Sequence, residues 1–206
     1  MNLKFTLAYD GSLFQGSQKQ PNGMTVEDKL LKAFKKINIE TNIVLSGRTD
    51  KEVHATGQVF NCVVPDFWQD FFKLKDILNK NLPSSIKILR IQKVKDDFHS
   101  RFHAKKRVYR YLITTKPTTP FNNKFITHIK NVDEELLQKA IKEFIGVYDF
   151  KYFHKTGSDK ELTKREIFDA KFYKYKDIYV FNFTANSYLR SQIRLMVGFL
   201  LAINDN

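Results

Sequence analysis

The chain has 206 residues, 42% of them hydrophobic, and a formal net charge of +13 at pH 7. This size and composition suit a globular protein of one large or two small domains. No apolar run approaches the roughly 20 residues of a membrane-spanning helix, and Leu3, Phe5 and Leu7 already alternate at the N-terminus, so neither membrane association nor a signal peptide is expected. The single cysteine, Cys62, excludes an internal disulfide and a zinc site of paired cysteines, which favours a reducing cytoplasm.

The positive charge favours a polyanionic partner, with nucleic acid ahead of a membrane surface. Lysines outnumber arginines by 27 to 8, a bias that can arise without any function, so charge alone does not establish RNA binding. The arginines are more informative because they cluster: Arg101, Arg107 and Arg110 lie within ten residues, and Arg190 and Arg194 within five. A guanidinium offers phosphate a planar fork of donors that lysine cannot replace.

The first half of the chain predicts the order strand, helix, strand, strand, helix, strand. Strands are expected at residues 3–9, 42–46, 58–64 and 86–94, and helices at 26–38 and 66–79. Thr25 is a suitable N-cap for the first helix, with Asp28 three residues on. The second helix is expected to bury Phe67, Phe71, Leu74 and Leu78. This order is that of the split βαβ, or ferredoxin-like, arrangement.

The second half repeats the order but lacks its last strand. Strands are expected at residues 107–115, 167–175 and 179–184, and helices from Asp133 to a stop at Gly146 and over 187–203. We therefore expect an α+β fold of two tandem ferredoxin-like, RRM-like βαββαβ halves, residues 1–104 and 105–206. Together the halves would form a mixed sheet with helices on one face, and such sheets often present the open face to RNA.

Four segments carry the specific signal of the sequence. They are YDGSLFQGSQ at 9–18, SGRTDKEVHA at 46–55, DFHSRFHA at 97–104 followed by RVYRY at 107–111, and NSYLRSQIR at 186–194. In this order and spacing they resemble the tRNA pseudouridine synthase A family along essentially the whole chain. The resemblance implies the pseudouridine synthase fold and an isomerase that acts on uridine in the anticodon stem-loop of tRNA. It also implies a homodimer and no metal or organic cofactor.

Asp50, in the second segment, is the candidate catalytic group. Pseudouridine formation breaks the N-glycosidic bond, turns the uracil and rejoins it to the ribose through carbon, and a carboxylate can serve this as nucleophile or base. Taken alone, an aspartate after a strand is more often a turn residue, but the resemblance implies that Asp50 is catalytic. Arg48 beside it could hold the carboxylate ionised and contact RNA phosphate.

The resemblance also suggests substrate-binding residues in the second half. Tyr109 falls at the family's active-site tyrosine, where a ring could stack on a flipped uracil. Taken alone, a tyrosine on this strand is more often a core residue, which is the role we assign to Tyr111. Arg194 is implied to pair with the catalytic aspartate and Arg190 to contact phosphate, although at helical spacing both could be solvated charges.

The remaining candidates come from loops of the first half. Asp10 belongs to a loop that resembles the family's first RNA-contacting loop, although a tight turn is also a sufficient reading. The resemblance assigns His54, His99 and Arg101 to the active-site rim and RNA surface. The histidines lack metal-ligand spacing, so no metal site is expected. No role is assigned to His103, His128 and His154.

The chain departs from the family pattern in three places. Ser17 replaces a tryptophan common in relatives, a change expected to alter packing more than chemistry. Glu52 replaces a usual glycine, and if that glycine has a positive φ, Glu52 strains the loop beside Asp50. The family pattern also continues beyond the end of this sequence with a helical stretch and a strand that lines the uracil pocket.

Two alternatives remain beside this interpretation. One is a pseudouridine synthase that acts on a different RNA site, and the other is a catalytically inactive RNA-binding or chaperone module of the same fold. The second alternative follows from Glu52 and from the strand expected to be missing. A ferredoxin-like metal carrier is excluded because the chain lacks the cysteines it would need.

Overall fold

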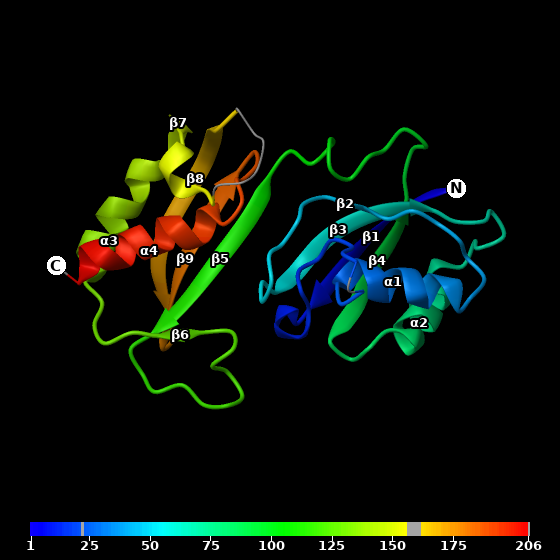
Figure 1. Ribbon diagram of the computed structural model, residues 1–206, viewed down its shortest axis with the longest axis horizontal. Helices are drawn as coiled ribbons and strands as arrows, with labels where there is room; N and C mark the ends of the chain where they lie inside the picture. Colours follow the sequence, from blue (N-terminus) through cyan, green and yellow to red (C-terminus); the bar gives the residue numbers. More distant parts are fainter. Residues whose placement is uncertain (22, 156–161, 206) are drawn as a thin grey trace. The chain divides into compact units, whose positions relative to one another are not determined.

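The computed structural model describes residues 1–21, 23–155 and 162–205. The chain divides into two compact units, residues 1–104 and 105–206, and each is described by itself. Each unit consists of a sheet, helices and connecting loops (Figure 1). The α+β class predicted from the sequence is confirmed.

The first unit contains a four-stranded antiparallel sheet. Its strands are β1 (Asn2–Tyr9), β2 (Val44–Leu45), β3 (Ala55–Val63) and β4 (Ile86–Lys93), in the spatial order β2-β3-β1-β4. Phe5 of β1 lies opposite Phe60 of β3 on one side and Ile91 of β4 on the other. This order, with the first strand in the centre, is the one a ferredoxin-like unit requires.

The core of this unit lies between one face of the sheet and two helices, α1 (Val26–Lys35) and α2 (Phe71–Asn81). Alternate β1 residues face the helices because side chains alternate along a strand. Phe5 is one of them, and it stacks on Phe60 with ring centroids 4.5 Å apart. The predicted cap of α1 is confirmed: Thr25 and Asp28 exchange hydrogen bonds in a capping box.

The predicted start of the second helix is wrong. α2 begins at Phe71, and Asp70 is its N-cap, accepting the Lys73 N–H at 2.9 Å. Asp66 instead pairs with the amino group of Met1 at 2.6 Å, which lowers the pKa of its carboxyl. Phe67, expected in the core, is 75% exposed.

The second unit contains a five-stranded mixed sheet. Its strands are β5 (Arg107–Thr114), β6 (Thr127–His128), β7 (Gly146–Asp149), β8 (Lys164–Tyr175) and β9 (Ile178–Ala185), in the order β6-β5-β9-β8-β7. β6 runs parallel to β5, and the other neighbours are antiparallel. The predicted hairpin is confirmed, with its turn at Lys176 and Asp177 between β8 and β9.

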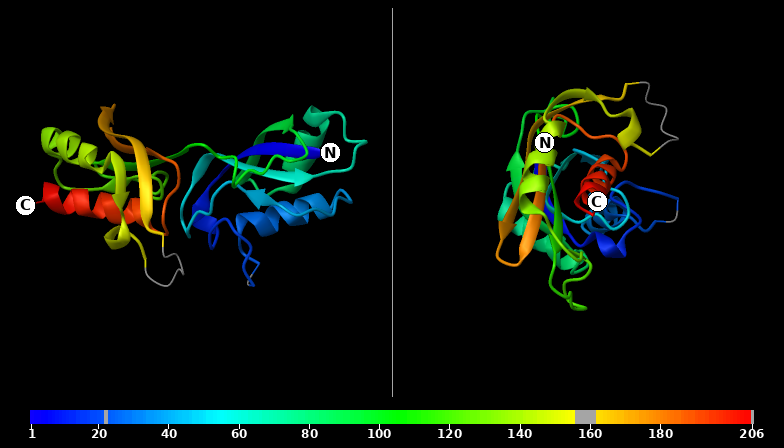
Figure 2. Two further views of the ribbon diagram at one scale, coloured as in Figure 1. Left: turned by 90° about the horizontal axis from the view of Figure 1, so that it is seen from above. Right: turned by 90° about the vertical axis from the view of Figure 1, so that its left-hand side faces the viewer.

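Two helices of this unit, α3 (Glu134–Ala140) and α4 (Gln192–Asn204), lie side by side over one face of the sheet (Figures 1 and 2). They share a core cluster with β8 and β9. Asn204 joins the end of α4 to the start of α3, because its amide accepts the Asp133 N–H at 2.8 Å and donates to Asn131 O at 3.1 Å.

Three expectations for this unit are corrected. The last helix begins at Gln192, not at residue 187, because Ser191 adopts a left-handed conformation with φ 60°. α3 ends at Ala140 and passes into a short 3₁₀ helix, η2 (Ile141–Phe144). Gly146, expected to end that helix, begins β7 with φ 130°, and neither β7 nor β6 was predicted.

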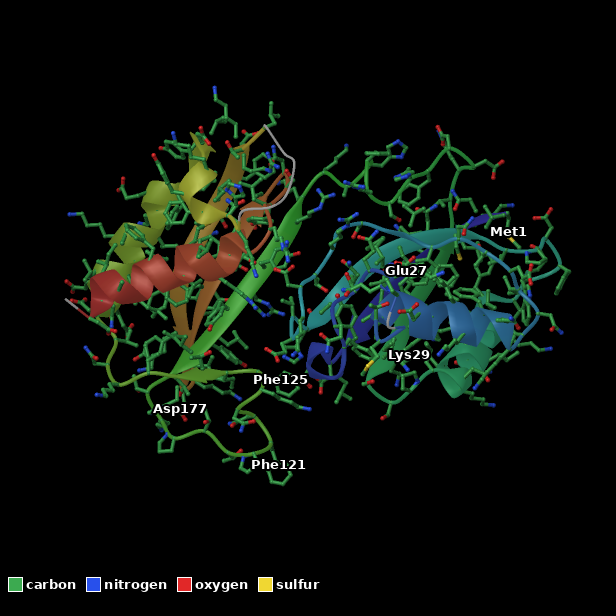
Figure 3. The ribbon with its side chains drawn as sticks, in the orientation of Figure 1. Met1, Glu27, Lys29, Phe121, Phe125 and Asp177 are labelled. Atoms are coloured by element: carbon green, nitrogen blue, oxygen red, sulfur yellow. The ribbon has the colours of Figure 1, made fainter. Side chains whose placement is uncertain are left out.

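β5 is paired very differently along its two sides. Antiparallel pairing with β9 extends from Arg107 to Ile113, whereas β6 pairs only with Ile113 and Thr114. In the described parts of the chain no other strand pairs with that second side of β5. In the first unit, the corresponding side of β1 is paired with β4. The connection from β5 to β6 carries Phe121, whose side chain is 89% exposed (Figure 3).

Within the residues that the structure describes, no helix combines the length and apolar composition needed to cross a bilayer.

Candidate active site

Asp50 lies in the loop at residues 46–54, which connects β2 to β3. The loop is tied to β3 by the Gln58 amide, which donates to Gly47 O at 2.6 Å. Beyond Asp50 the loop turns tightly, because the Val53 N–H donates to Asp50 O at 3.2 Å. The aspartate is half-buried, so its carboxylate belongs to a fixed loop and still has access to solvent.

A buried serine holds this loop one residue before Asp50. The Ser17 N–H donates to Thr49 O at 3.1 Å, and Ser17 Oγ accepts the Thr49 N–H at 2.8 Å. The Tyr9 hydroxyl, at the end of β1, lies 2.8 Å from Thr49 Oγ1. Ser17 is fully buried, so no water competes for these bonds. The serine therefore positions the loop through hydrogen bonds, which goes beyond the packing change expected from the sequence.

Two glycines allow the 9–18 segment to approach the loop closely. A Cβ on Gly11 would lie 2.0 Å from Val53 O, and a Cβ on Gly16 would lie 2.8 Å from Thr49 O. Gly16 also has φ 103°, a conformation that other residues rarely adopt. The glycines of the first motif are therefore required by backbone contact with the second motif.

Asp10 and His54 lie together at the far end of the loop. Asp10 Oδ1 is 3.1 Å from His54 Nδ1 and also accepts the Ser12 N–H at 3.1 Å. The Gly11 N–H points to the same His54 Nδ1 at 3.0 Å. One nitrogen cannot both accept from Gly11 and donate to Asp10, so each bond requires a different position of the ring proton, which is absent from Nδ1 for the first bond and present on Nδ1 for the second.

Glu52 has φ 67°, in the left-handed region that favours glycine. The positive φ considered from the sequence for position 52 is therefore present, and a non-glycine residue adopts this backbone conformation two residues after Asp50. Its exposed side chain lies 3.8 Å from Lys51 Nζ. Arg48 is exposed on the other side of Asp50, so its guanidinium is accessible to a ligand.

Two buried asparagines fix a second candidate segment, residues 95–100. The Asn2 side chain donates to three carbonyl oxygens, those of Lys95, Asp96 and Phe98, at 2.9–3.3 Å. The Asn61 side chain donates to Asn2 Oδ1 at 3.0 Å and accepts the Ser100 N–H at 2.8 Å. The segment is therefore held to β1 and β3 by side-chain bonds rather than by a sheet ladder.

Residues 99–102, at the end of this segment, present stacked side chains. The His99 ring stacks on Phe102 with centroids 4.3 Å apart, and the Arg101 guanidinium lies 5.8 Å from the same ring. Phe102 is 74% exposed. The structure thus brings His99 and Arg101 together about an exposed aromatic ring, which is a surface suited to bases and phosphates.

In the second unit, Tyr109 is supported by an aromatic contact. Its ring meets Tyr188 edge to face, with centroids 5.1 Å apart and planes at 83°. Burial raises the pKa of the Tyr188 hydroxyl, and the nearby Tyr109 raises it further. Tyr109 is half-buried, whereas Tyr111 packs against the core cluster, as expected. Tyr109 is therefore in contact with its own unit and partly accessible.

Arg190 and Arg194 are both exposed, but they do not share a helix face. Arg190 precedes the helix, in the turn where Gln192 Oε1 accepts the Leu189 N–H at 2.8 Å. Arg194 lies in the first turn of α4, which carries no acidic residue. The suggested helical spacing between the two arginines is thus wrong, although both lie near the positive end of the helix, where anions are favoured.

The structure joins Asp10, Arg48, Asp50 and His54 in and beside one loop, and His99 with Arg101 in one turn. Sequence reasoning missed several residues that support these groups, namely Asn2, Ser17, Asn61, Phe102 and Tyr188. The polar residues within apolar strands, Asn2 and Asn61, were a usable signal, since a buried amide must find partners. Across the described residues there is no group of three or more His, Cys, Asp or Glu side chains that could hold a metal ion.

Comparison with known proteins defines the class to which this fold and loop belong. The sequence pattern described as tRNA pseudouridine synthase matches residues 6–103 and 140–206. The chain belongs to the tRNA pseudouridine synthase family, which is a family of isomerases.

Individual relatives agree with this assignment. A protein named tRNA pseudouridine synthase A from Wolinella succinogenes is 40% identical over 197 residues, which cover 96% of this chain and 78% of the relative. Proteins of the same name from Campylobacter jejuni and Streptococcus agalactiae are each 38% identical over 98% of this chain, covering 85% and 80% of their own lengths.

Proposed function

We propose that this protein converts uridine to pseudouridine in tRNA, with Asp50 as the catalytic carboxylate. The observation that carries the proposal is the clamped loop: in a chain of this family, Thr49 is held at its N–H, its C=O and its hydroxyl, one residue before a half-buried aspartate. A carboxylate held in this way is preorganised, because little freedom remains to be lost when the substrate binds.

The reaction is an isomerisation and needs no added atoms. The bond between uracil N1 and ribose C1′ breaks, the base turns, and C5 bonds to C1′. The proton on C5 is lost and N1 gains one, so the balance is closed. Asp50 serves as the nucleophile or base that this sequence needs, and the uridine must leave the stack to reach it.

The substrate-binding roles proposed for the other candidates follow from their chemistry. Arg48, Arg101 and Arg190 are exposed guanidinium groups suited to phosphate. Tyr109 offers a partly accessible ring for the base, and Arg194 is the cation proposed to act with Asp50. His54 and Asp10 brace the loop and are proposed to contact RNA. We also propose the anticodon arm as target and a homodimer as the active form, both from family resemblance.

The test uses tRNA transcripts tritiated at uridine C5, because isomerisation releases the C5 proton. Wild type, Asp50→Asn and the matched control Asp76→Asn, an exposed aspartate on α2, are compared. Release by wild type and Asp76→Asn but not by Asp50→Asn is expected. Transcripts in which the anticodon-arm uridines are replaced by cytidine should release no tritium.

The competing interpretation is an RNA-binding module without catalysis, favoured by the strained Glu52 beside Asp50. Tight tRNA binding by all three proteins, with no tritium release from any of them, would establish that alternative. Tritium release from transcripts without anticodon-arm uridines would support the isomerisation and would show that the target uridine lies elsewhere in the tRNA.

A further inference from the structure

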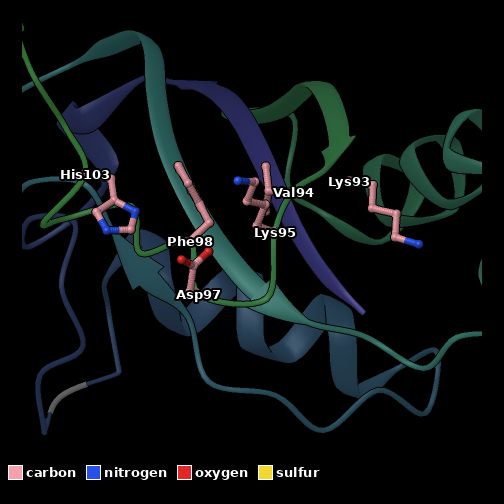
Figure 4. Close-up of a pocket in the computed structure, with 6 residues that line it drawn as sticks. All are labelled: Lys93, Val94, Lys95, Asp97, Phe98 and His103. Atoms are coloured by element: carbon pink, nitrogen blue, oxygen red, sulfur yellow. The ribbon is translucent and has the colours of Figure 1, made fainter.

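An open pocket lies at the end of β4, outside the Asp50 loop (Figure 4). Its volume is about 660 Å³, within the range of small-molecule sites. Its lining consists of Lys93, Val94, Lys95, Asp97, Phe98 and His103. Of these side chains, His103 accepts the His99 N–H through Nδ1 at 3.3 Å.

The pocket is built on a fixed backbone. The carbonyl groups of Lys95 and Phe98 are bound by the buried Asn2 side chain at 3.1 and 2.9 Å, and Asn61 anchors the next turn through Ser100. Because the bonds are buried or partly buried, water competes poorly for them. The lining side chains thus project from a segment whose path is already set, which lowers the cost of ligand binding.

The lining combines an aromatic pair with cations. Phe98 and His103 meet edge to face, with ring centroids 5.8 Å apart. His103 and Lys93 lie at opposite ends of the pocket in Figure 4, with Lys95 between them. Lys93, Lys95 and Asp97 are exposed, so two positive groups and one carboxylate are available to a ligand. The excess of positive charge favours an anion, and the rings favour a flat apolar face beside it.

We infer that this pocket binds one nucleotide of the RNA substrate, outside the reacting uridine. Its base stacks against Phe98 and His103, and its phosphate pairs with Lys95 and, at the far end, Lys93. Ionised Asp97 can only accept hydrogen bonds, so it favours a base with an exocyclic amine, namely adenine, cytosine or guanine, over uracil, whose single N–H donor lies between two carbonyl oxygens. The inference rests on the proposed function, because the ligand is taken to be part of the tRNA.

The position of the pocket in the chain supports RNA over other anions. The turn that directly follows presents His99 and Arg101 about the exposed Phe102 ring. Pocket and turn form one continuous stretch, residues 93–103, in which cations and aromatic rings accompany one another, with Asp96 and Asp97 between the lysines and the rings. Such a combination is how proteins hold consecutive nucleotides, with rings for the bases and cations for the backbone.

The experiment measures tRNA binding over a range of salt concentrations. Asp50→Asn provides the background, so that binding is observed without turnover. Lys95→Ala and Lys93→Ala should each reduce the slope of log affinity against log salt by about 0.7 to 0.9, the value for one lost phosphate contact. His103→Ala should weaken binding about 5- to 150-fold, as expected for one lost stacking partner.

Lys35→Ala is the matched control, because it removes an equally exposed lysine from the end of α1 in the same unit. It should leave the slope unchanged. Ultraviolet crosslinking of bound tRNA, followed by mass spectrometry, should attach a nucleotide other than uridine to Phe98 or His103. Equal slopes for the pocket and control variants, with no crosslink within residues 93–103, would overturn the inference.

Binding and isomerisation can fail separately. If tRNA binds through the pocket but the unmodified chain releases no tritium, the inferred nucleotide site is supported and the proposed isomerisation is contradicted. If tritium release is normal and kcat/KM is the same in Lys93→Ala, Lys95→Ala and Lys35→Ala, the proposed isomerisation is supported and the inferred nucleotide site is contradicted.

Discussion

Each of the two units packs two helices on one face of a sheet, but they hold their candidate functional residues in different ways. In the first unit, Asp50 lies in an irregular loop whose neighbour Thr49 is fixed by hydrogen bonds from Ser17 and Tyr9. In the second, Tyr109 lies in a regular strand and rests on the ring of Tyr188. The carboxylate that we propose as catalytic thus depends on polar bonds with strict geometry, and the tyrosine on apolar contact, which is more tolerant.

Gly11→Ala should have the largest effect. Its Cβ would lie 2.0 Å from Val53 O, a backbone atom, so the 46–54 loop must move. We expect a loss of about 3 kcal/mol in the free energy of unfolding, at the upper end for overpacking, together with loss of tritium release. Denaturant unfolding and the tritium assay measure these. Gly57→Ala is the control, because nothing lies within 4 Å of a Cβ there; equal damage from both substitutions would contradict the close approach.

Ser17→Ala should have the next largest effect. It removes the acceptor for the Thr49 N–H and leaves that partly buried group without this partner, which costs about 1–2 kcal/mol. Displacement of Asp50 should lower kcat about 10- to 100-fold with little change in tRNA affinity. Ser17→Thr keeps the hydroxyl and should restore part of kcat. Ser187→Ala, which removes a hydroxyl that donates to the adjacent Asn186 side chain at 3.3 Å, is the control. If KM rises while kcat is unchanged, Ser17 does not position Asp50.

Glu52→Gly should stabilise the chain slightly. A left-handed conformation costs a non-glycine residue about 1 kcal/mol, and glycine avoids most of that strain. The melting temperature should therefore rise, by a few degrees at most, because glycine also gains freedom in the unfolded state. Lys51→Gly, one residue earlier and outside the set of residues with positive φ, should instead lower it. A lower melting temperature for Glu52→Gly would show that the Glu52 side chain compensates for the strain.

Tyr188→Phe should have the smallest effect. The hydroxyl donates to Arg107 O at 3.4 Å, a long bond worth about 0.5 kcal/mol or less, while the ring that supports Tyr109 is kept. Activity should be unchanged, whereas Tyr188→Leu, which removes the ring, should lower it. The same tritium assay compares the two. A loss of activity in Tyr188→Phe would mean that the second unit also relies on a polar bond.

Alternation and capping were sufficient to predict most of the strands and the α1 helix, because these features depend on neighbours within a few residues. The predicted start of α2 failed because Asp66 binds the amino group of Met1, 65 residues away, and leaves Asp70 as the cap. The predicted start of α4 failed because the left-handed backbone at Ser191 is not encoded by any glycine. β6, with two residues, is too short for any periodic pattern.

The candidate site residues could be predicted where the resemblance supplied a motif. The residues that hold them in place through contacts from distant parts of the chain could not. Asp50, His54 and Asp10 were chosen from their motifs, and the structure joins them in one loop cluster. The hydrogen bonds between Ser17 and Thr49 were not predictable, because the two residues are 32 positions apart in the sequence. Ser17 also stands where the family pattern has a tryptophan, whose side chain cannot accept the Thr49 N–H. Hydrogen bonds between distant segments leave no periodicity in the sequence.

The paired amides of Asn2 and Asn61 also constrain how the chain can be made. Their partners include Phe98 O and Ser100 N–H, so β1 carries unsatisfied buried groups until the last residues of the first unit have been synthesised. A nascent chain therefore completes these buried bonds only once residues 98–100 have been made, which is before the second unit is synthesised. Vectorial synthesis would then deliver the clamped Asp50 loop as a finished module, onto which the tyrosine-bearing unit is added.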